Sequence, residues 1–401
     1  MPKALIVGGG ITGLATAMVL SRQGIEVDLI ERQAQVRTLG SGITLIGAAL
    51  RALDRLGLYQ ECAASGYPVT HMETYDVDGT LAARVQLPSP AGADQPGMLG
   101  MMRPALHRIL LGHAAEQGTA VRVATSPARI EQQAGVASVT FSTGERRDYD
   151  LVVGADGLRS TVRDLVFGPI HPVFRGQGAF RVILPRPAGV TAHAQFRSSG
   201  DVAVGLTPTA PDQMYLYCLF PVDEDYRPPA AELVSLARAR IEPFGGVVAE
   251  LREAIGEPGQ IHYTRFETML APDPWYRGRV IVIGDAAHCT TPHLAAGAAM
   301  CLEDAIALGE ELAAAPTVDD ALCAFCKRRF DRCKYVVETA AQLSYWQIHP
   351  ETPGADHQGS PRRPSPGSPG HSDCLRASRL AVVLAVLLGA QPGEHVAQLA
   401  E

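Results

Sequence analysis

The sequence predicts an α/β protein in which a parallel sheet covered by helices is interleaved with a second, mainly antiparallel β-sheet. Three observations carry this prediction. Near the N-terminus, an apolar run enters a glycine-rich turn that opens a helix. Two later apolar runs end in short turns that contain Gly and Asp. Between these two runs, residues 171–270 divide into short apolar or alternating runs separated by Gly, Pro and Asp, which is typical of antiparallel strands.

The composition narrows the class of protein. Hydrophobic residues make up 46% of the 401 residues and charged residues 19%, so the chain can bury a large core, in roughly two or three lobes. The formal net charge of −7 argues against a nucleic-acid partner, because binding a phosphate backbone needs a surplus of Lys and Arg. No secretory signal is readable, and the longest apolar run, Leu380 to Ala390, is far shorter than the ~20 residues that span a bilayer. We therefore expect a cytoplasmic protein without stable membrane insertion.

The first unit of the chain is a strand, a turn and a helix. The buried-strand pattern at 4–7 leads into Gly8-x-Gly10-x-x-Gly13, and apolar residues then recur at helical spacing. The next strand ends at Glu31, about 20 residues after the glycines, where a carboxylate can accept hydrogen bonds from ribose hydroxyls. Gly8 allows the tight turn, Gly10 lets a pyrophosphate approach the backbone, and Gly13 lets the helix pack on the strand. The unit predicts Rossmann-like dinucleotide binding. It does not distinguish FAD from NAD(P), although Glu31 disfavours the 2′-phosphate of NADP.

Two further motifs follow buried strands later in the chain. The run 151–153 enters a tight turn at Asp156-Gly157, and the run 280–283 ends in Gly284-Asp285. Taken singly, each fits an ordinary turn after a strand. A carboxylate just beyond the C-terminal end of a strand nevertheless lies where α/β sheets present groups to ligands.

Together, in this order and spacing, the three segments resemble the class A FAD-dependent aromatic hydroxylases, the monooxygenases typified by p-hydroxybenzoate and salicylate hydroxylases. The resemblance covers about residues 1–345, and the segments 31–43, 49–58 and 103–106 are also similar to this family. It implies a p-hydroxybenzoate hydroxylase-like fold, with a Rossmann-like FAD-binding domain and an interleaved, mainly antiparallel substrate domain. The limits we expect are 1–70, 104–170 and 271–345 for the FAD-binding domain, 71–103 and 171–270 for the substrate domain, and 346–401 for a C-terminal linker and tail.

The resemblance also implies a set of FAD-binding residues. The glycine motif and Glu31 hold the ADP half of FAD, Asp285 binds the ribityl chain, and Arg103 lies along the path of the flavin and phosphates. Asp156 belongs to a motif tied to both FAD and NAD(P)H, and a helix beginning near Gly297 points its positive N-terminus at the flavin ring. The full expected set is Gly8, Gly10, Gly13, Glu31, Arg32, Gly42, Arg103, Asp156, Asp285, Gly297 and Ala298. One departure stands out, because Ala295-Ala296-Gly297 replaces the Gly-Gln-Gly of many relatives.

The activity implied by the resemblance is hydroxylation of a phenolic or heteroaromatic small molecule. NADH or NADPH reduces FAD, O2 adds to give a flavin C4a-hydroperoxide, and its distal oxygen is transferred to the ring. The sequence contains no second strand-GxGxxG-helix unit, which disfavours enzymes with a separate NAD(P)H domain. A flavin-dependent halogenase needs a W-x-W-x-I-P segment, which the only tryptophans, Trp275 and Trp346, cannot form. Two alternatives stay open: a non-catalytic FAD-bearing ligand-binding protein, and a monooxygenase acting on a non-phenolic substrate such as a polyketide or alkaloid. Either a monomer or a homodimer is expected.

The substrate contacts are expected on the antiparallel sheet. Alternation places Tyr215 and Tyr217 on one face of their strand. The candidates by residue type are Arg181, His193, Gln195, Arg197, Tyr215 and Tyr217, of which we favour Arg181 and Tyr217. Each also fits a solvated strand residue or a core aromatic. His293, near the expected flavin edge, is a further weak candidate, whereas His288 is expected to pack beside the cofactor loop.

The remaining features have structural interpretations. Cys323, Cys326 and Cys333 share the spacing of one helix face, and no nearby His or Cys pair completes a metal site, so we expect small thiols packed inward and no metal. From about residue 350 the chain has the Pro-, Ser- and Gly-rich composition of a linker, followed by a short apolar segment at 380–388. We assign no function to residues beyond about Ser360.

Overall fold

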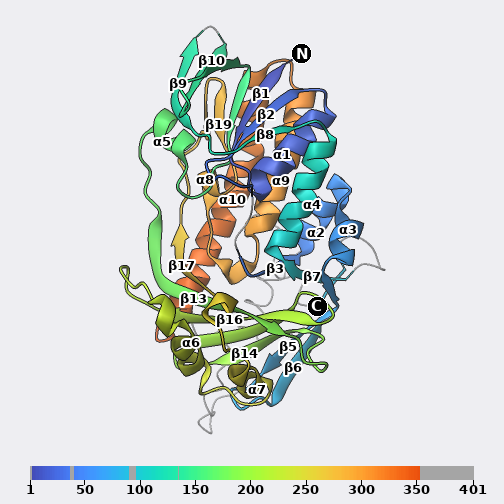
Figure 1. Cartoon of the computed structure of the whole chain (residues 1–401), viewed down its shortest axis with the longest axis vertical. Coiled ribbons are helices and arrows are strands. Elements are labelled where there is room, and N and C mark those ends of the chain that lie inside the picture. The colour runs from blue at the N-terminus through green and yellow to red at the C-terminus, as the bar shows by residue number, and fades with distance from the viewer. Residues whose placement is uncertain (1, 37–39, 90–95, 134, 353–401) are drawn as a thin grey trace, which may run out of the picture.

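The computed structural model describes residues 2–36, 40–89, 96–133 and 135–352. The tail prediction therefore falls almost wholly outside the described residues. In Figure 1 a helix-rich lobe with a parallel sheet stands above a second, flatter sheet, and the long strand β13 (Val173–Pro185) and the long helix α10 (Val318–Ile348) run between the two. No helix of the described chain is long and apolar enough to cross a membrane.

The first lobe is built on a six-stranded sheet with the order β18-β19-β12-β1-β2-β8. All neighbouring pairs are parallel except β18 with β19, which is antiparallel. The strands are β1 (Lys3–Val7), β2 (Glu26–Ile30), β8 (Ala120–Arg122), β12 (Leu151–Gly154), β18 (Tyr276–Arg277) and β19 (Val280–Val282). Because β1, β12 and β19 are buried runs that lie side by side, the turns that follow them meet at one edge of the sheet.

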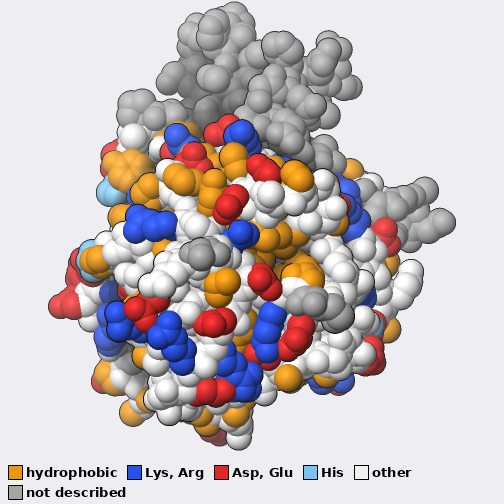
Figure 2. All heavy atoms as spheres, turned by 90° about the horizontal axis from the view of Figure 1, so that it is seen from above, with side chains coloured by type: hydrophobic (Ala, Val, Ile, Leu, Met, Phe, Trp, Pro, Cys, Tyr) orange, Lys and Arg blue, Asp and Glu red, His pale blue; other side chains and the backbone are white. Residues whose placement is uncertain are grey.

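Helices cover this sheet and form one large apolar core with it. The helices are α1 (Ile11–Arg22), α2 (Gly47–Leu56), α3 (Tyr59–Ala64), α4 (Arg103–Glu116), α5 (Thr161–Phe167), α8 (Asp285–His288), α9 (Gly297–Ala314) and α10. A small antiparallel sheet of β9 (Pro127–Gln133), β10 (Val136–Phe141) and β11 (Arg146–Tyr149) lies at the far end of the lobe (Figure 1). The surface at that end intersperses basic and acidic side chains (Figure 2).

The second lobe is a seven-stranded sheet with the order β17-β13-β16-β15-β14-β5-β6. Its strands are β5 (His71–Tyr75), β6 (Leu81–Gln86), β13, β14 (His193–Ser199), β15 (Val202–Pro208), β16 (Gln213–Pro221) and β17 (Ile261–Thr268). Strand alternation sends Phe180, Val182, Leu216 and Cys218 to one face, where they form a core with α6 (Leu233–Ile241) and α7 (Val247–Glu253). The predicted antiparallel strands within 171–270 are confirmed, and β5 and β6 add two strands from the segment 71–103 to the same sheet.

A third antiparallel sheet joins the lobes. It consists of β3 (Gly42–Ile46), β7 (Met98–Met102) and β4 (Tyr67–Val69). Two of these strands come from the predicted FAD-binding segment 1–70 and one from the predicted substrate segment 71–103, so the domain limits remain a prediction. The α/β fold class with an interleaved, mainly antiparallel sheet is confirmed.

Candidate active site

The turn between β1 and α1 is tightly packed at two of its glycines and open at the third. Gly8 has a φ of +111°, and a Cβ there would lie 2.4 Å from the carbonyl oxygen of Ala155. A Cβ on Gly13 would lie 1.9 Å from the carbonyl oxygen of Gly8, which explains why the helix passes so close to the turn. By contrast, a Cβ on Gly10 would meet nothing within 4 Å. The open side of the turn therefore faces the N-terminal amides of α1, which is the arrangement that an anionic phosphate group needs.

Two side chains hold this turn from opposite directions. The Glu31 carboxylate accepts hydrogen bonds from the amides of Gly9 (2.9 Å) and Gln33 (2.8 Å). Buried His107, one turn into α4, donates from Nε2 to the carbonyl oxygen of Gly9 at 2.7 Å. The Glu31 carboxylate thus lies directly beside the glycine turn. His107 is not among the predicted residues, and its only signal in the sequence is its place four residues after Arg103.

The Gly284-Asp285 motif packs against the same turn. Gly284 has a φ of +60°, and a Cβ there would lie 2.4 Å from Oγ1 of Thr12 in the first turn of α1. Asp285 follows at the start of α8, half-buried, and its carboxylate has no hydrogen-bond partner within the described chain. A partly buried carboxylate without a protein donor fits the hydroxyl groups of a bound ribityl chain.

The Asp156-Gly157 motif is tied to its own helix. The Asp156 carboxylate accepts hydrogen bonds from the Ser160 hydroxyl (2.5 Å) and from the amides of Thr161 (2.7 Å) and Val162 (3.2 Å) at the N-terminus of α5. Burial raises the pKa of Asp156 even though these donors act in the opposite direction. Asp156 therefore shapes the loop, and its predicted contact with FAD or NAD(P)H stays a prediction.

Arg163, on the same helix, connects two of the motifs. Its buried guanidinium donates to the carbonyl oxygens of Ala286 (3.0 Å), Leu158 (3.0 Å) and Ile170 (3.2 Å). Because Ala286 lies in α8, Arg163 fixes the position of the helix that carries Asp285.

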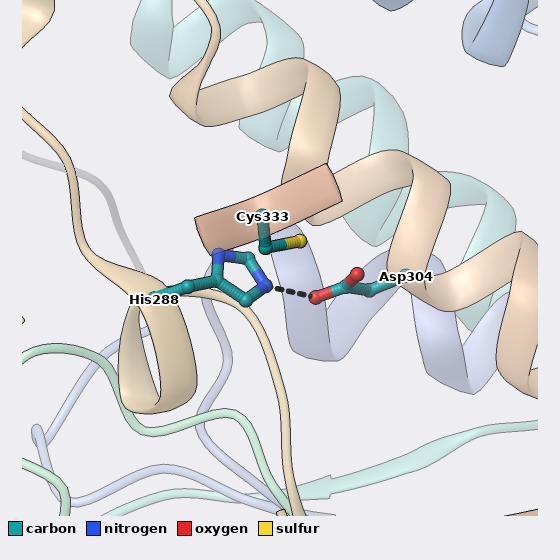
Figure 3. Close-up of side chains that lie close together, drawn as sticks. All are labelled: His288, Asp304 and Cys333. Atoms are coloured by element: carbon teal, nitrogen blue, oxygen red, sulfur yellow. Dashed lines mark hydrogen bonds and ion pairs between the residues drawn. The ribbon is translucent and has the colours of Figure 1, made fainter. Parts of the chain in front are cut away.

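A buried ion network holds the Gly284 turn, and Figure 3 shows three of its neighbours, His288, Asp304 and Cys333. Asp304 of α9 accepts hydrogen bonds from the amide of Gly284 (2.9 Å), from Nε2 of His288 (2.6 Å) and from Nε of Arg329 on α10 (2.7 Å). Burial alone would raise the pKa of Asp304, but His288 and Arg329 outweigh it and lower the pKa to about 2. Burial alone would lower the pKa of His288, but its neighbours Cys333 and Asp304 hold that pKa well above its usual value. The network therefore ties α8, α9 and α10 to the Gly284 turn.

The thiol of Cys333 completes this cluster without making it a metal site. Atoms of His288, Asp304 and Cys333 that could ligate an ion lie within 4.8 Å of one another. The Arg329 guanidinium already contacts both Asp304 and Cys333 (3.6 Å to Sγ), so a metal ion would face a fixed positive charge. Cys326 and Cys333 pack inward as predicted, whereas Cys323 is only half-buried.

Helix α9 begins at Gly297, as predicted, and directs its N-terminus at the same edge of the sheet. The loop before it contains Ala295, which adopts the left-handed conformation (φ +47°) that favours glycine. Gly297 and Ala298 are both half-buried at the helix start. The Ala-Ala-Gly departure from the family pattern therefore places a strained residue beside the expected flavin.

The face of the seven-stranded sheet that lies opposite α6 and α7 carries most of the residues predicted to contact the substrate. Arg181 of β13 lies opposite Tyr217 of β16 and His262 of β17, and Tyr217 in turn lies opposite Gly205, which is paired with Gln195. Residues directly opposite in a sheet share a face, so these side chains form one row. A Cβ on Gly205 would lie 2.1 Å from the Tyr217 ring, so this glycine makes room for the ring.

Contacts with the first lobe show where this face points. Tyr215, two residues from Tyr217, lies 2.7 Å from Oγ1 of Thr44 through its hydroxyl, and a Cβ on Gly42 would lie 1.9 Å from its ring. Gly42 is thus a packing site for Tyr215, and its predicted contact with FAD remains a prediction. Arg103, at the start of α4, is close enough to lower the pKa of Arg181, although burial lowers it more.

The other predicted residues lie elsewhere. Both ring nitrogens of His293 have protein partners, Nδ1 toward Thr291 (3.0 Å) and Nε2 toward Gln347 (2.9 Å), and its predicted contact with substrate stays a prediction. Arg197 forms an ion pair with Asp76 (2.8 Å) past an irregularity in β14. Arg32 is exposed and makes no hydrogen bond or ion pair within the described chain. Its predicted role is untested.

The open glycine turn, the carboxylates of Glu31 and Asp285 and the N-terminus of α9 converge on one edge of the parallel sheet, and this donor set fits FAD. The family described as "FAD binding domain" matches residues 1–340. The chain belongs to this family of FAD-dependent monooxygenases, and NAD(P)H is the typical co-substrate of the family.

Individual proteins agree with this assignment. "Putative FAD-dependent monooxygenase YetM" of Bacillus subtilis is 31% identical over 89% of this chain and 96% of its own length. The 2-heptyl-3-hydroxy-4(1H)-quinolone synthase of Pseudomonas aeruginosa (strain PAO1) is 32% identical over 86% of this chain and 90% of its own. The structure of the tetrameric form of 2-methyl-3-hydroxypyridine-5-carboxylic acid oxygenase superposes with a TM-score of 0.73 at 26% identity, covering 89% of this chain and 96% of that one. The predicted family, enzyme class and FAD cofactor are confirmed.

Proposed function

We propose that this monooxygenase hydroxylates a heteroaromatic small molecule between the FAD-binding edge and the face of the seven-stranded sheet that carries Arg181 and Tyr217. In the balanced overall reaction, a ring C–H group, O2, NAD(P)H and a proton are converted to a ring C–OH group, NAD(P)+ and water. The observation that carries the proposal is the row of Arg181, Tyr217 and Gln195 facing the lobe that holds Asp285 and Arg103. Two of the compared proteins, named for a quinolone and a hydroxypyridine, support a nitrogen-containing ring.

An apolar cluster beside this row supports an aromatic substrate. Met72 pairs in register with His193 of β14 and packs with Tyr67 and Ala295 against a small core. That core consists of Ile46, Val69, Leu87 and Met98. The apolar cluster reaches the loop before α9, so a flat ring can contact apolar carbon on one side and the polar row on the other.

The chain's own residues would bind and orient the reactants. Asp285 and Glu31 would hold the sugar hydroxyls of FAD, Gly10 would admit its pyrophosphate, and the N-terminus of α9 would stabilise negative charge on the flavin ring. Bound FAD would supply the transfer of electrons from NAD(P)H to O2 and of oxygen to the substrate. The row of Arg181, Tyr217 and Gln195 would place the reacting ring carbon within reach of the flavin and exclude water from it. We place the reaction in the cytoplasm, where NAD(P)H is supplied, in a monomer or homodimer.

Turnover of the purified yellow protein tests the proposal. NAD(P)H oxidation and O2 uptake are measured with and without a panel of phenols and nitrogen heterocycles, and hydroxylated product is identified by mass spectrometry. We expect a heterocycle to accelerate NAD(P)H oxidation with formation of product. A protein that retains FAD but responds to no compound would instead be a non-catalytic FAD-bearing binding protein. Acceleration only by a polyketide or alkaloid would favour the other alternative.

A further inference from the structure

The loop 289–296 connects the two helices that border the expected flavin. It follows α8, which carries Asp285, and it ends where α9 begins at Gly297. Within it, Pro292–Leu294 forms a single 3-10 turn and Ala295 adopts the left-handed conformation (φ +47°). The partial positive charge of a helix N-terminus falls off within its first turn, so the place of this loop decides how strongly α9 acts on the flavin ring.

His293 fastens this loop to α10. Its Nδ1 lies 3.0 Å from the hydroxyl oxygen of Thr291, and its Nε2 lies 2.9 Å from the side-chain amide of Gln347. The Thr291 hydroxyl in turn donates to the carbonyl oxygen of Ala340 at 2.9 Å. Because Ala340 and Gln347 lie seven residues apart, which is close to two turns of helix, both contacts fall on one face of α10. The loop is therefore held to α10 at two points, and the His293 ring joins them.

The same ring also contacts the seven-stranded sheet. Phe266 of β17 meets His293 edge to face, with ring centroids 5.7 Å apart and an angle of 86° between the ring planes. Phe266 forms a small apolar cluster with Ala179 and Leu219, against which Tyr217 packs. The His293 ring thus lies at the junction of the loop 289–296, helix α10 and the sheet that carries the predicted substrate contacts.

A second amide holds the seven-stranded sheet to the same end of α10. Ser344, about one turn before Gln347, hydrogen-bonds the side chain of Gln177 on β13. Gln177 and Gln347 are both at least nine-tenths buried, and each amide has one polar end without a hydrogen-bond partner in the described chain. A buried amide with an unmatched end is unfavourable, and an apolar side chain of the same size would stabilise the protein more. Stability alone therefore does not account for Gln347 at this position.

We propose that Gln347 and His293 are positioning residues, which hold the loop 289–296 against the flavin and thereby raise the reduction potential of bound FAD. Gln347 sets the direction of the His293 ring, and the ring fixes the backbone that leads into α9. A loop released from α10 would let its amides and the N-terminus of α9 move away from the flavin, so that negative charge on the reduced ring would be less stabilised. The inference goes beyond the proposed function, because it requires FAD and no particular substrate.

The test is the midpoint potential of bound FAD, measured without substrate. The FAD-loaded protein is titrated reductively beside a reference dye, and the absorbance spectrum of the oxidised flavin is recorded. Gln347→Met keeps the length of the side chain and removes the amide, whereas His293→Phe keeps an aromatic ring against Phe266 and removes both ring nitrogens. In each variant we expect the ratio of reduced to oxidised flavin at a given potential to fall about tenfold, which lowers the midpoint by about 30 mV for a two-electron couple, and the spectrum to change.

Two comparisons show whether Gln347 acts through His293. The double variant His293→Phe/Gln347→Met should have the midpoint potential of His293→Phe alone, because the second change removes a contact that the first has already broken. Gln342→Met is the matched control, since Gln342 is an exposed glutamine of the same helix, and it should leave the potential and the spectrum unchanged. Urea unfolding of the FAD-free proteins reports their stability separately.

A wild-type potential and spectrum in folded Gln347→Met and His293→Phe would overturn the inference, even if both variants unfold at lower urea concentrations, because the contacts would then serve stability alone. Additive shifts in the double variant would overturn it as well, since Gln347 would then act by another route. Should His293→Phe not fold, the comparison of Gln347→Met with Gln342→Met decides. These measurements use no substrate, so a screen in which no compound stimulates NAD(P)H oxidation would reject the proposed function and leave this inference standing.

Discussion

Substitution of Gly10 by alanine separates folding from cofactor binding. Gly10 has φ −81° and ψ −174°, a conformation that alanine adopts without strain, and its Cβ would meet nothing within 4 Å. The folded protein without FAD should therefore keep its stability or gain about 0.4–1 kcal/mol, because alanine restricts the unfolded chain. The same methyl group would occupy the approach of the pyrophosphate to the amides of α1.

The loss of affinity can be estimated from the contacts displaced. A hydrogen bond from an amide to a charged phosphate contributes about 1.5–3 kcal/mol, so losing one should raise the Kd of FAD about 10-fold to 150-fold. FAD-free protein is titrated with FAD and followed by flavin fluorescence, and urea unfolding gives stability. Gly112→Ala, in the interior of α4 with open space around its Cβ, is the control and should bind FAD normally.

Gly13→Ala provides the contrast, because its Cβ would overlap the Gly8 carbonyl oxygen at 1.9 Å. That variant should lose stability before any question of FAD arises. Wild-type FAD affinity in Gly10→Ala would refute the placement of the pyrophosphate. A large loss of stability in the same variant would refute the argument that the space beside Gly10 belongs to a ligand.

Three further predictions concern the Gly284-Asp285 motif and its surroundings. Asp285→Ala should lose FAD during gel filtration while the FAD-free protein unfolds at the same urea concentration as wild type, since no described residue hydrogen-bonds the carboxylate; full retention of yellow colour would contradict the ribityl role. Asp304→Asn should destabilise the FAD-free protein by about 3–5 kcal/mol at pH 7, because it leaves buried charges unpaired. The lowered pKa of Asp304, about 2, means that its contribution is complete above the unfolded value near 4 and is lost as the pH falls toward 2, so urea unfolding of the two proteins should converge there. Ala295→Gly should relieve a left-handed alanine and add about 1 kcal/mol, as should the control Ala124→Gly (φ +50°), but only Ala295→Gly should change the flavin spectrum; identical spectra would separate this loop from the flavin.

Local rules of sequence predicted the backbone of the site. The glycine spacing and Glu31 predicted a strand, turn and helix, because a side chain at Gly8 or Gly13 would clash with the backbone and Gly10 leaves the turn open. Strand alternation likewise placed Tyr215 and Tyr217 on one face, and the structure adds that Arg181 and Gln195 share it.

The sequence could not predict which side chains support these loops. His107 meets Gly9 across 98 positions of sequence and Arg163 meets Ala286 across 123, and such pairs depend on how separate helices pack. The direction of the His293 ring could not be predicted for the same reason, since it is set by Gln347, 54 residues further along. A periodic pattern reports the environment of a residue on its own element and carries no information about its partner on another.

The convergence of three distant turns has a thermodynamic consequence. The groups expected to touch FAD begin at Gly8 and end beyond Asp285, and Asp304 and Arg163 hold the later turns in place. No part of the chain shorter than this can form the whole set, so FAD discriminates between the native state and every partly folded one. Free FAD at a hundred times its Kd would then shift the folding equilibrium by about 2.7 kcal/mol. In a cell short of flavin, the amount of this protein that survives proteolysis should therefore follow the supply of its cofactor, before any substrate is present.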